Sequence, residues 1–98
     1  MEVEFRNDKL DRLETDPDFD AGFSREIVRA YRRRIQSIRA AADERDLYNV
    51  RGHRFKKLKG DREHQYSMRL NDQWRLIIEI KEERPANTVI VVDIEDYH

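Results

Sequence analysis

Residues 65–80 constrain the fold most strongly, because two strand-like runs there are joined by one short turn. Apolar and polar side chains alternate through both runs, which predicts two β-strands that each have one apolar face. These faces comprise Tyr66, Met68, Leu70, Trp74, Leu76, Ile78 and Ile80. A two-residue turn would pair Leu70 with Gln73 and mix apolar and charged side chains on one face. A three-residue turn, Asn71 to Gln73, pairs Leu70 with Trp74 instead, so we predict a hairpin with this longer turn.

This register places Arg69 opposite Arg75 on the polar face of the hairpin. Like charges that face each other across two strands destabilise a sheet by a few tenths to ~1 kcal/mol. Two interpretations are open. Either an anion binds between the arginines, or each arginine pairs with a nearby carboxylate such as Glu79 or Glu95.

The N-terminal half predicts a short strand followed by two helices. Val3 and Phe5 alternate with charged residues, as in a strand. Asn7 can cap a brief helix, and Ser24 can cap a longer helix from about Arg25 to Asp43. The core stripe of the longer helix is predicted at Ile27, Tyr31, Ile35, Ile38 and Ala42. Four arginines of this helix lie mostly away from the stripe: Arg29, Arg32, Arg33 and Arg39. They form either a basic face that binds a phosphate backbone or an acidic partner, or a face that is only solvated.

The C-terminal half predicts a polar loop over residues 43–50, with Leu47 and Tyr48 turned back to the core, and then four strands. The first of these is predicted at Arg54–Leu58, and the last is the β-branched run Thr88–Asp96, which suits a central strand. This order is typical of an α+β fold in which two N-terminal helices pack on one face of a mainly antiparallel sheet.

Composition predicts a single cytoplasmic domain, residues 1–98, with a local polyanion site. No cysteine is present, no run of ~18 apolar residues could span a membrane, and the first residues do not form a signal peptide. Charged residues make up 42% of the chain, yet the net charge is −1. Residues 51–75 carry +5, whereas residues 1–23 carry −5 and residues 76–98 carry −4. The basic middle favours a polyanion site, although a pI near 6.3 is low for a nucleic-acid binder.

The sequence contains no motif that indicates a metal site, a serine nucleophile or a nucleotide cofactor. The three histidines share no zinc-ligand spacing, no nucleophile elbow surrounds a serine, and three glycines cannot make a nucleotide-binding loop. We therefore expect no metal and no cofactor.

The remaining cluster suits metal-free RNA cleavage. That reaction needs a base for the 2′-hydroxyl, an acid for the leaving 5′-oxygen and cations for the charge on phosphorus. Tyr97 and His98 could move protons or stack on a base, although a terminal histidine is more often a frayed end. The cluster comprises Lys56, Lys57, Lys59, Arg69, Arg75, Asp96, Tyr97 and His98.

Three segments resemble the HigB toxins of the RelE/ParE superfamily: Leu58–Asp61, Ser67–Arg75 and the terminal Asp96–Tyr97–His98. The resemblance implies two helices on a curved, mainly antiparallel sheet, similar to microbial ribonucleases. It implies a plasmid-maintenance toxin that cleaves mRNA in the ribosomal A site without metal. It also implies a HigA-like helix-turn-helix antitoxin as partner, with operator DNA bound only through the toxin–antitoxin complex.

The resemblance also implies roles for individual residues. Lys59 would contact the phosphate, Arg75 would stabilise the transition state and Arg69 would support it. Asp96, Tyr97 and His98 would form the acid/base group. RNA binding would fall to Arg54, Lys56 and Lys57. Many relatives place a histidine where this chain has Lys56, which leaves the identity of the base open.

A second hypothesis is a non-catalytic homologue with the same fold. Such a protein would bind the antitoxin as a co-repressor, or act on another target, as ParE-type relatives act on gyrase. Codon-phased breaks in mRNA would discriminate between the two hypotheses.

Overall fold

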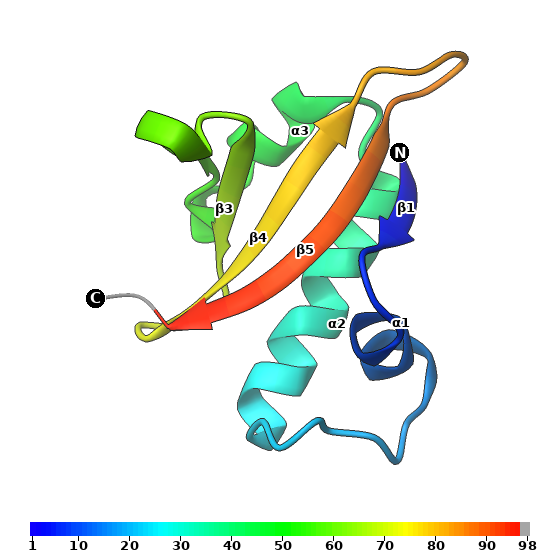
Figure 1. Ribbon diagram of the computed structural model, residues 1–98, viewed down its shortest axis with the longest axis vertical. Coiled ribbons are helices and arrows are strands. Elements are labelled where there is room, and N and C mark those ends of the chain that lie inside the picture. Colours follow the sequence, from blue (N-terminus) through cyan, green and yellow to red (C-terminus); the bar gives the residue numbers. More distant parts are fainter. Residues whose placement is uncertain (97–98) are drawn as a thin grey trace.

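The computed structural model describes residues 1–96. It shows a five-stranded mixed sheet with the helices packed on one face (Figure 1). The strand order is β1-β5-β4-β3-β2, with β1 parallel to β5 and the other neighbours antiparallel. The predicted α+β class is confirmed. In chain order the elements are β1 (Glu2–Phe5), α1 (Asp8–Thr15), α2 (Arg25–Ala40), α3 (Glu44–Asn49), the 3-10 turn η1 (Arg51–His53), β2 (Lys56–Lys57), the 3-10 turn η2 (Gly60–Arg62), β3 (Gln65–Arg69), β4 (Trp74–Lys81) and β5 (Thr88–Asp96).

The β3–β4 hairpin has the predicted three-residue turn. Arg69 faces Arg75 across the two strands, and the Leu70 amide donates to the Trp74 carbonyl at 2.9 Å. The side-chain oxygen of Asn71 accepts from the amides of Gln73 and Trp74, at 2.8 and 2.7 Å. This Asx turn explains why the longer loop is stable.

A bulge in β5 changes which of its side chains face the helices. Ile77 lies opposite Asp93 and Ile78 lies opposite Val91, so Val92 is an extra residue. Val91 and Ile94 are consequently both buried, although three positions separate them. A bulge bends its strand and re-aims the side chains beyond it, as the curved course of β4 and β5 illustrates (Figure 1).

The core lies between the helices and the sheet. The two predicted N-caps are confirmed, because Asn7 accepts from the Leu10 amide at 3.0 Å and Ser24 from the Ile27 amide at 3.3 Å. The buried core includes Leu10, Leu13, Ile27, Tyr31, Ile35, Ile38, Met68, Leu76, Ile78, Val89 and Val91.

The predicted end of the long helix was wrong by three residues. α2 stops at Ala40, Ala41 is buried and Ala42 is exposed. Asp43 instead caps α3, because its carboxylate accepts from the Arg45 amide at 2.9 Å. The Met1 ammonium group donates to three carbonyls at the end of α2, the shortest contact being 2.6 Å.

The region between α2 and β3 also differs from the prediction. Residues 44–49 form a helix instead of a loop, and Tyr48 is half-exposed although Leu47 is buried. The predicted strand at 54–58 is reduced to Lys56–Lys57. Arg54 adopts a left-handed backbone with φ of 45°, which interrupts the extended chain before β2.

Two of the α2 arginines hold the helices together. Arg32 donates to the carbonyls of Leu13 and Asp16 at 3.0 Å each, so it binds the C-terminal end of α1. Arg39 forms a bidentate ion pair with Glu14. Arg29 and Arg33 are exposed. The helix therefore presents a mixed surface, part structural and part solvated, and no continuous basic face.

Candidate functional site

A pocket of about 240 Å³ lies on the sheet face turned away from the helices, which we call the open face. Ser67 on β3, Arg75 and Ile77 on β4 and Glu95 on β5 share this face because their positions pair across the strands. The segment that contains η2 closes one side. The lining residues are Leu58, Arg62, Ser67, Arg75, Ile77, Glu95 and Asp96.

Arg75, one of two arginines in the lining, contributes a positive charge to the open-face pocket. In the sheet, Arg75 lies opposite Arg69 on the neighbouring strand β3 and opposite Glu95 on the neighbouring strand β5. Its Nε and Nη1 atoms are buried, and Ile77 beside it is only 2% exposed. A guanidinium group with little access to water interacts more strongly with a bound charge than one on an open surface.

The repulsion between the two arginines is relieved by a local carboxylate. Arg69 forms an ion pair with Asp72, in the turn of the same hairpin. The proposed pairing with a carboxylate is therefore right for Arg69, but the partner is neither Glu79 nor Glu95.

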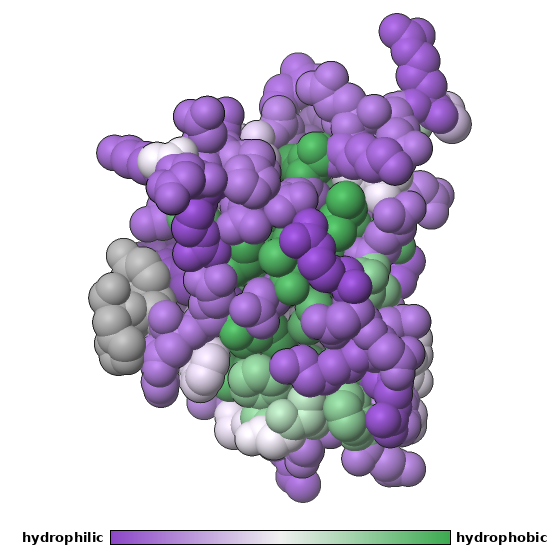
Figure 2. Space-filling view, in the orientation of Figure 1, coloured by the Kyte–Doolittle hydropathy of each residue, from purple (hydrophilic) through white to green (hydrophobic). Residues whose placement is uncertain are grey.

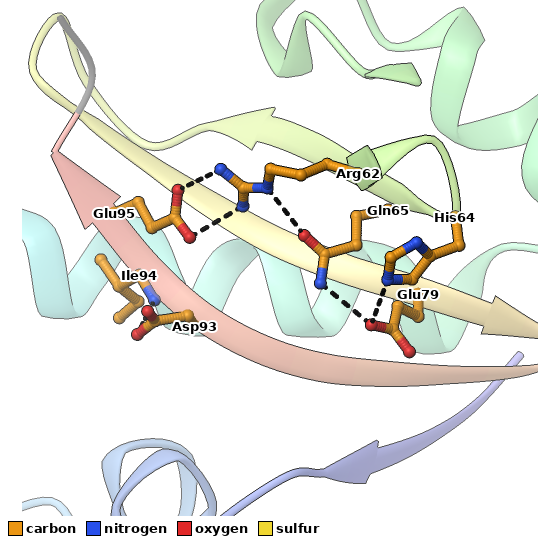
Figure 3. A network of polar contacts seen from close by, with 7 residues as sticks. All are labelled: Arg62, His64, Gln65, Glu79, Asp93, Ile94 and Glu95. Atoms are coloured by element: carbon orange, nitrogen blue, oxygen red, sulfur yellow. Dashed lines mark hydrogen bonds and ion pairs between the residues drawn. The ribbon is translucent and has the colours of Figure 1, made fainter. Parts of the chain in front are cut away.

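Glu95 and Glu79 belong to a polar network that crosses the open face (Figure 3). Both Glu95 oxygens accept from the Arg62 guanidinium group, at 3.0 and 2.8 Å. Arg62 Nε donates to Gln65 at 3.0 Å, and Gln65 donates to Glu79 at 3.0 Å. Arg6 donates to the other Glu79 oxygen at 3.0 Å. The hydrogen bond from Gln65, and then the charges of Arg6 and His64, lower the pKa of Glu79 below its ordinary value.

Ser67 contributes a buried hydroxyl group to the pocket. The residue is 2% exposed, and its oxygen makes no hydrogen bond within residues 1–96. A buried hydroxyl group is normally paired. The hydrogen-bonding capacity of Ser67 is therefore unused by the described residues.

The predicted site residues divide into three groups. Arg75 and Asp96 line the pocket together, and Gln73 donates to Asp96 at 3.0 Å. Five others are not part of its lining: Arg69, which lies opposite Arg75 in the hairpin, Lys59, which follows the lining residue Leu58 in the chain, and the exposed Arg54, Lys56 and Lys57. Tyr97 and His98 lie outside the described residues.

Sequence reasoning missed Arg62 altogether. Its partner Glu95 is 33 positions away, so no local pattern indicates the pair. The face of Ser67 follows from the alternation of the hairpin, because it lies between Tyr66 and Met68, whereas the sequence indicated Glu95 only as a possible partner for the arginines.

Residues 1–96 contain neither a cluster of metal-ligating side chains nor a membrane-spanning helix. No three histidine, aspartate or glutamate side chains lie close enough together to hold a metal ion. No helix there has both the length and the apolar character needed to cross a membrane. The surface in Figure 2 is mostly hydrophilic, with apolar side chains visible between the charged ones.

A family model and a solved structure match the chain. The family model described as "RelE-like toxin of type II toxin-antitoxin system HigB" matches residues 3–98. A solved structure, the YoeB/ParE toxin from Agrobacterium tumefaciens, is similar with a TM-score of 0.66 and 15% identity, and the match covers 100% of both chains. No curated protein matches the sequence. At this identity the structural likeness supports the fold alone.

Proposed function

The chain belongs to the HigB-like family of RelE-like toxins from type II toxin–antitoxin systems, and we propose that it cleaves mRNA in the ribosomal A site as a metal-independent endoribonuclease. Membership of a type II system implies an antitoxin partner. We propose that this partner is a HigA-like helix-turn-helix protein, that the complex binds operator DNA through it, and that the toxin acts in the cytoplasm.

The observation that carries the proposal is the position of Arg75. Its guanidinium group is partly buried in the open-face pocket, and Asp96 lines the same pocket. Tyr97 and His98 follow Asp96 directly in the chain. The pocket thus combines a cation with a carboxylate, two kinds of group that in-line attack on a phosphodiester uses, and the roles of Tyr97 and His98 are proposed from the sequence.

The proposed roles follow the chemistry of 2′-hydroxyl attack. The 2′-oxygen bonds to phosphorus, the bond to the 5′-oxygen breaks, and a 2′,3′-cyclic phosphate and a 5′-hydroxyl result. Among Asp96, Tyr97 and His98, one group accepts the 2′-proton and another protonates the 5′-oxygen. Arg75 stabilises the charge on the phosphate. Lys59 and Arg69 support the phosphate, and Arg54, Lys56 and Lys57 bind the RNA backbone.

Dependence on the ribosome is consistent with the modest charge of the site. The pocket lining holds two arginines and two carboxylates, and the whole chain carries −1. Such a surface attracts free RNA weakly, because affinity for phosphate backbones rests on net positive charge. A ribosome that presents the message in a fixed geometry would replace this affinity with orientation.

The test is induction of the toxin together with primer extension on a reporter message. We expect growth arrest and codon-phased breaks, both lost in Arg75→Ala and His98→Ala. Arg33→Ala removes one positive charge from an exposed position on α2, and this control should retain both effects. Arrest without breaks would contradict the proposal and favour a toxin homologue that acts on another target, such as gyrase, or as a co-repressor.

A further inference from the structure

We propose that Arg62 is a second anion-binding residue of the open-face pocket, and that Glu95 holds it there until a phosphate of the substrate replaces the carboxylate. The inference rests on the proposed function, since it takes the phosphodiester of RNA as the anion. It adds a binding residue, and a carboxylate that sets the affinity, to the site around Arg75.

The geometry of the Arg62–Glu95 pair suits such an exchange. Two guanidinium nitrogens face the two carboxylate oxygens, at 3.0 and 2.8 Å (Figure 3). A phosphate group offers two oxygens to the same fork of donors. Arg62 can therefore exchange one partner for the other without changing its mode of binding.

A third hydrogen bond keeps Arg62 oriented during the exchange. Arg62 Nε donates to Gln65 at 3.0 Å, on the side away from Glu95. The Gln65 amide is itself held, because its nitrogen donates to Glu79 at 3.0 Å. The guanidinium group thus remains over the open face when the carboxylate leaves.

The pair is also easy to separate. The side chains of Arg62 and Glu95 are 44% and 36% exposed. Water can therefore reach both side chains, and each charge can be solvated when the pair opens. A phosphate could contact both Arg62 and Arg75. These two contacts together should be stronger than the single ion pair between Arg62 and Glu95 that the phosphate replaces.

Ser67 supplies a second, independent observation. Its buried hydroxyl group lines the same pocket and has no protein partner within residues 1–96. A bound phosphate oxygen would accept a hydrogen bond from it. The pocket then offers an anion two arginines and a neutral donor, with Leu58 and Ile77 as apolar walls.

Glu95 consequently controls the charge of the pocket. The lining carries two positive and two negative side chains, and Glu95→Gln leaves it with a net charge of +1. One unit charge a few ångströms away, in water, changes affinity about fivefold. Removal of Glu95 should therefore strengthen anion binding, which loss of a merely structural ion pair would not do.

The first experiment titrates the full-length protein with inorganic phosphate and follows backbone amide signals by NMR. We expect Glu95→Gln to bind phosphate about fivefold more tightly than wild type, and Arg62→Gln and Ser67→Ala more weakly. The double variant Glu95→Gln/Arg62→Gln should lose the gain. Glu82→Gln removes the same charge from an exposed loop position and should bind as wild type does.

Equal phosphate affinities in Glu95→Gln and Glu82→Gln would overturn the inference, as would an unchanged affinity in Arg62→Gln. Should Glu95→Gln fail to fold, Arg62→Gln and Ser67→Ala still decide it. Both must weaken phosphate binding while urea unfolding remains cooperative.

The second experiment measures cleavage of ribosome-bound message and separates the inference from the proposed function. We expect Glu95→Gln to lower KM and Arg62→Gln to raise it. In one outcome, the wild-type protein fails to cleave RNA while the variants show the phosphate affinities expected above. That result would refute the proposed nuclease activity and leave the anion-binding pocket in place. A wild type that cleaves, with KM unchanged in both variants, would retain the nuclease and refute the role of Arg62.

Discussion

Arg75 lies between two charged neighbours of opposite sign, Arg69 on β3 and Glu95 on β5. The like charge is partly neutralised by Asp72, and the unlike one is already engaged by Arg62. The electrostatic surroundings of this one residue are thus set by pairs that lie outside its own strand. This arrangement explains how a sheet can keep two arginines side by side without a bound anion.

Tyr31 illustrates a buried polar contact whose loss should be measurable. Its hydroxyl group donates to the Leu10 carbonyl at 2.7 Å, and the residue is 0% exposed. Burial, and then the charges of Glu14 and Asp11, raise its pKa well above the ordinary value. Tyr31→Phe leaves the Leu10 carbonyl unpaired, which should lower the free energy of unfolding by about 1–3 kcal/mol in urea denaturation.

Tyr48→Phe is the matched control for this substitution. Tyr48 is half-exposed, so water can take the place of its hydroxyl group in the variant, and we expect a change within about 0.5 kcal/mol. Equal effects of the two substitutions would show that the contact with Leu10 adds nothing to stability.

His53 should make stability depend on pH. It is 3% exposed, and burial, followed by the charge of Arg34, lowers its pKa below the ordinary 6.5, against an opposing hydrogen bond with the Leu47 backbone. A lowered pKa means that the fold favours neutral imidazole. This contribution is complete above pH 6.5 and is lost as the pH falls through the folded-state pKa.

We expect the free energy of unfolding to fall between pH 7.5 and pH 5.5, by less than about 1.4 kcal/mol per pH unit, the limit for one proton. His53→Gln should flatten this dependence, as measured by urea denaturation at several pH values. A variant with the same slope as wild type would assign the pH dependence to other groups.

At the scale of elements, one arginine of α2 binds the C-terminal end of α1. Arg32 reaches two carbonyls at and beyond the C-terminal end of α1, those of Leu13 and Asp16. Carbonyls at a helix end have no partner within the helix, so a cationic donor satisfies them and also complements the helix dipole. The arginine-rich appearance of α2 therefore reflects packing between helices as well as exposure to solvent.

Arg32→Met should lower the free energy of unfolding by about 1–3 kcal/mol, because it removes two hydrogen bonds from a charged donor but keeps much of the apolar stem. Arg33→Met changes the neighbouring exposed position and should stay within about 0.5 kcal/mol. Thermal or urea unfolding of both variants checks the difference. Similar losses in the two would refute the anchoring role of Arg32.

At the scale of the whole molecule, the sheet separates the charges of the chain. β1, with the exposed Glu2 and Glu4, forms one edge of the sheet, and β2, with Lys56 and Lys57, forms the other. The acidic N-terminal segment is therefore far from the basic edge in strand order. The molecule can present a positive edge to a polyanion although its net charge is −1.

We expect the double substitution Lys56→Glu/Lys57→Glu to weaken co-sedimentation with ribosomes by about tenfold at low ionic strength, and less as salt is raised. The control Lys9→Glu/Arg29→Glu makes the same change of net charge at exposed positions on α1 and α2. It should have a clearly smaller effect. Equal losses would indicate that net charge, and not the β2 edge, governs association.

The sequence by itself determined the features that depend on near neighbours. Alternation and the Asn71 turn specified the β3–β4 register, including the contact of Arg69 with Arg75. The caps Asn7 and Ser24 specified where two helices begin. Each of these rests on contacts within a few residues, so the local pattern contains the physical cause.

Only the tertiary structure decided the features that depend on distant partners. The pairing of Arg62 with Glu95 joins residues 33 positions apart, and the bulge at Val92 aims Glu95 at the open face. The last carbonyls of α2, which ends at Ala40, are bound by the Met1 ammonium group from the other end of the chain. A regular alternation cannot reveal a bulge, and composition cannot reveal an ion pair, because both arise when segments distant in sequence meet on one sheet.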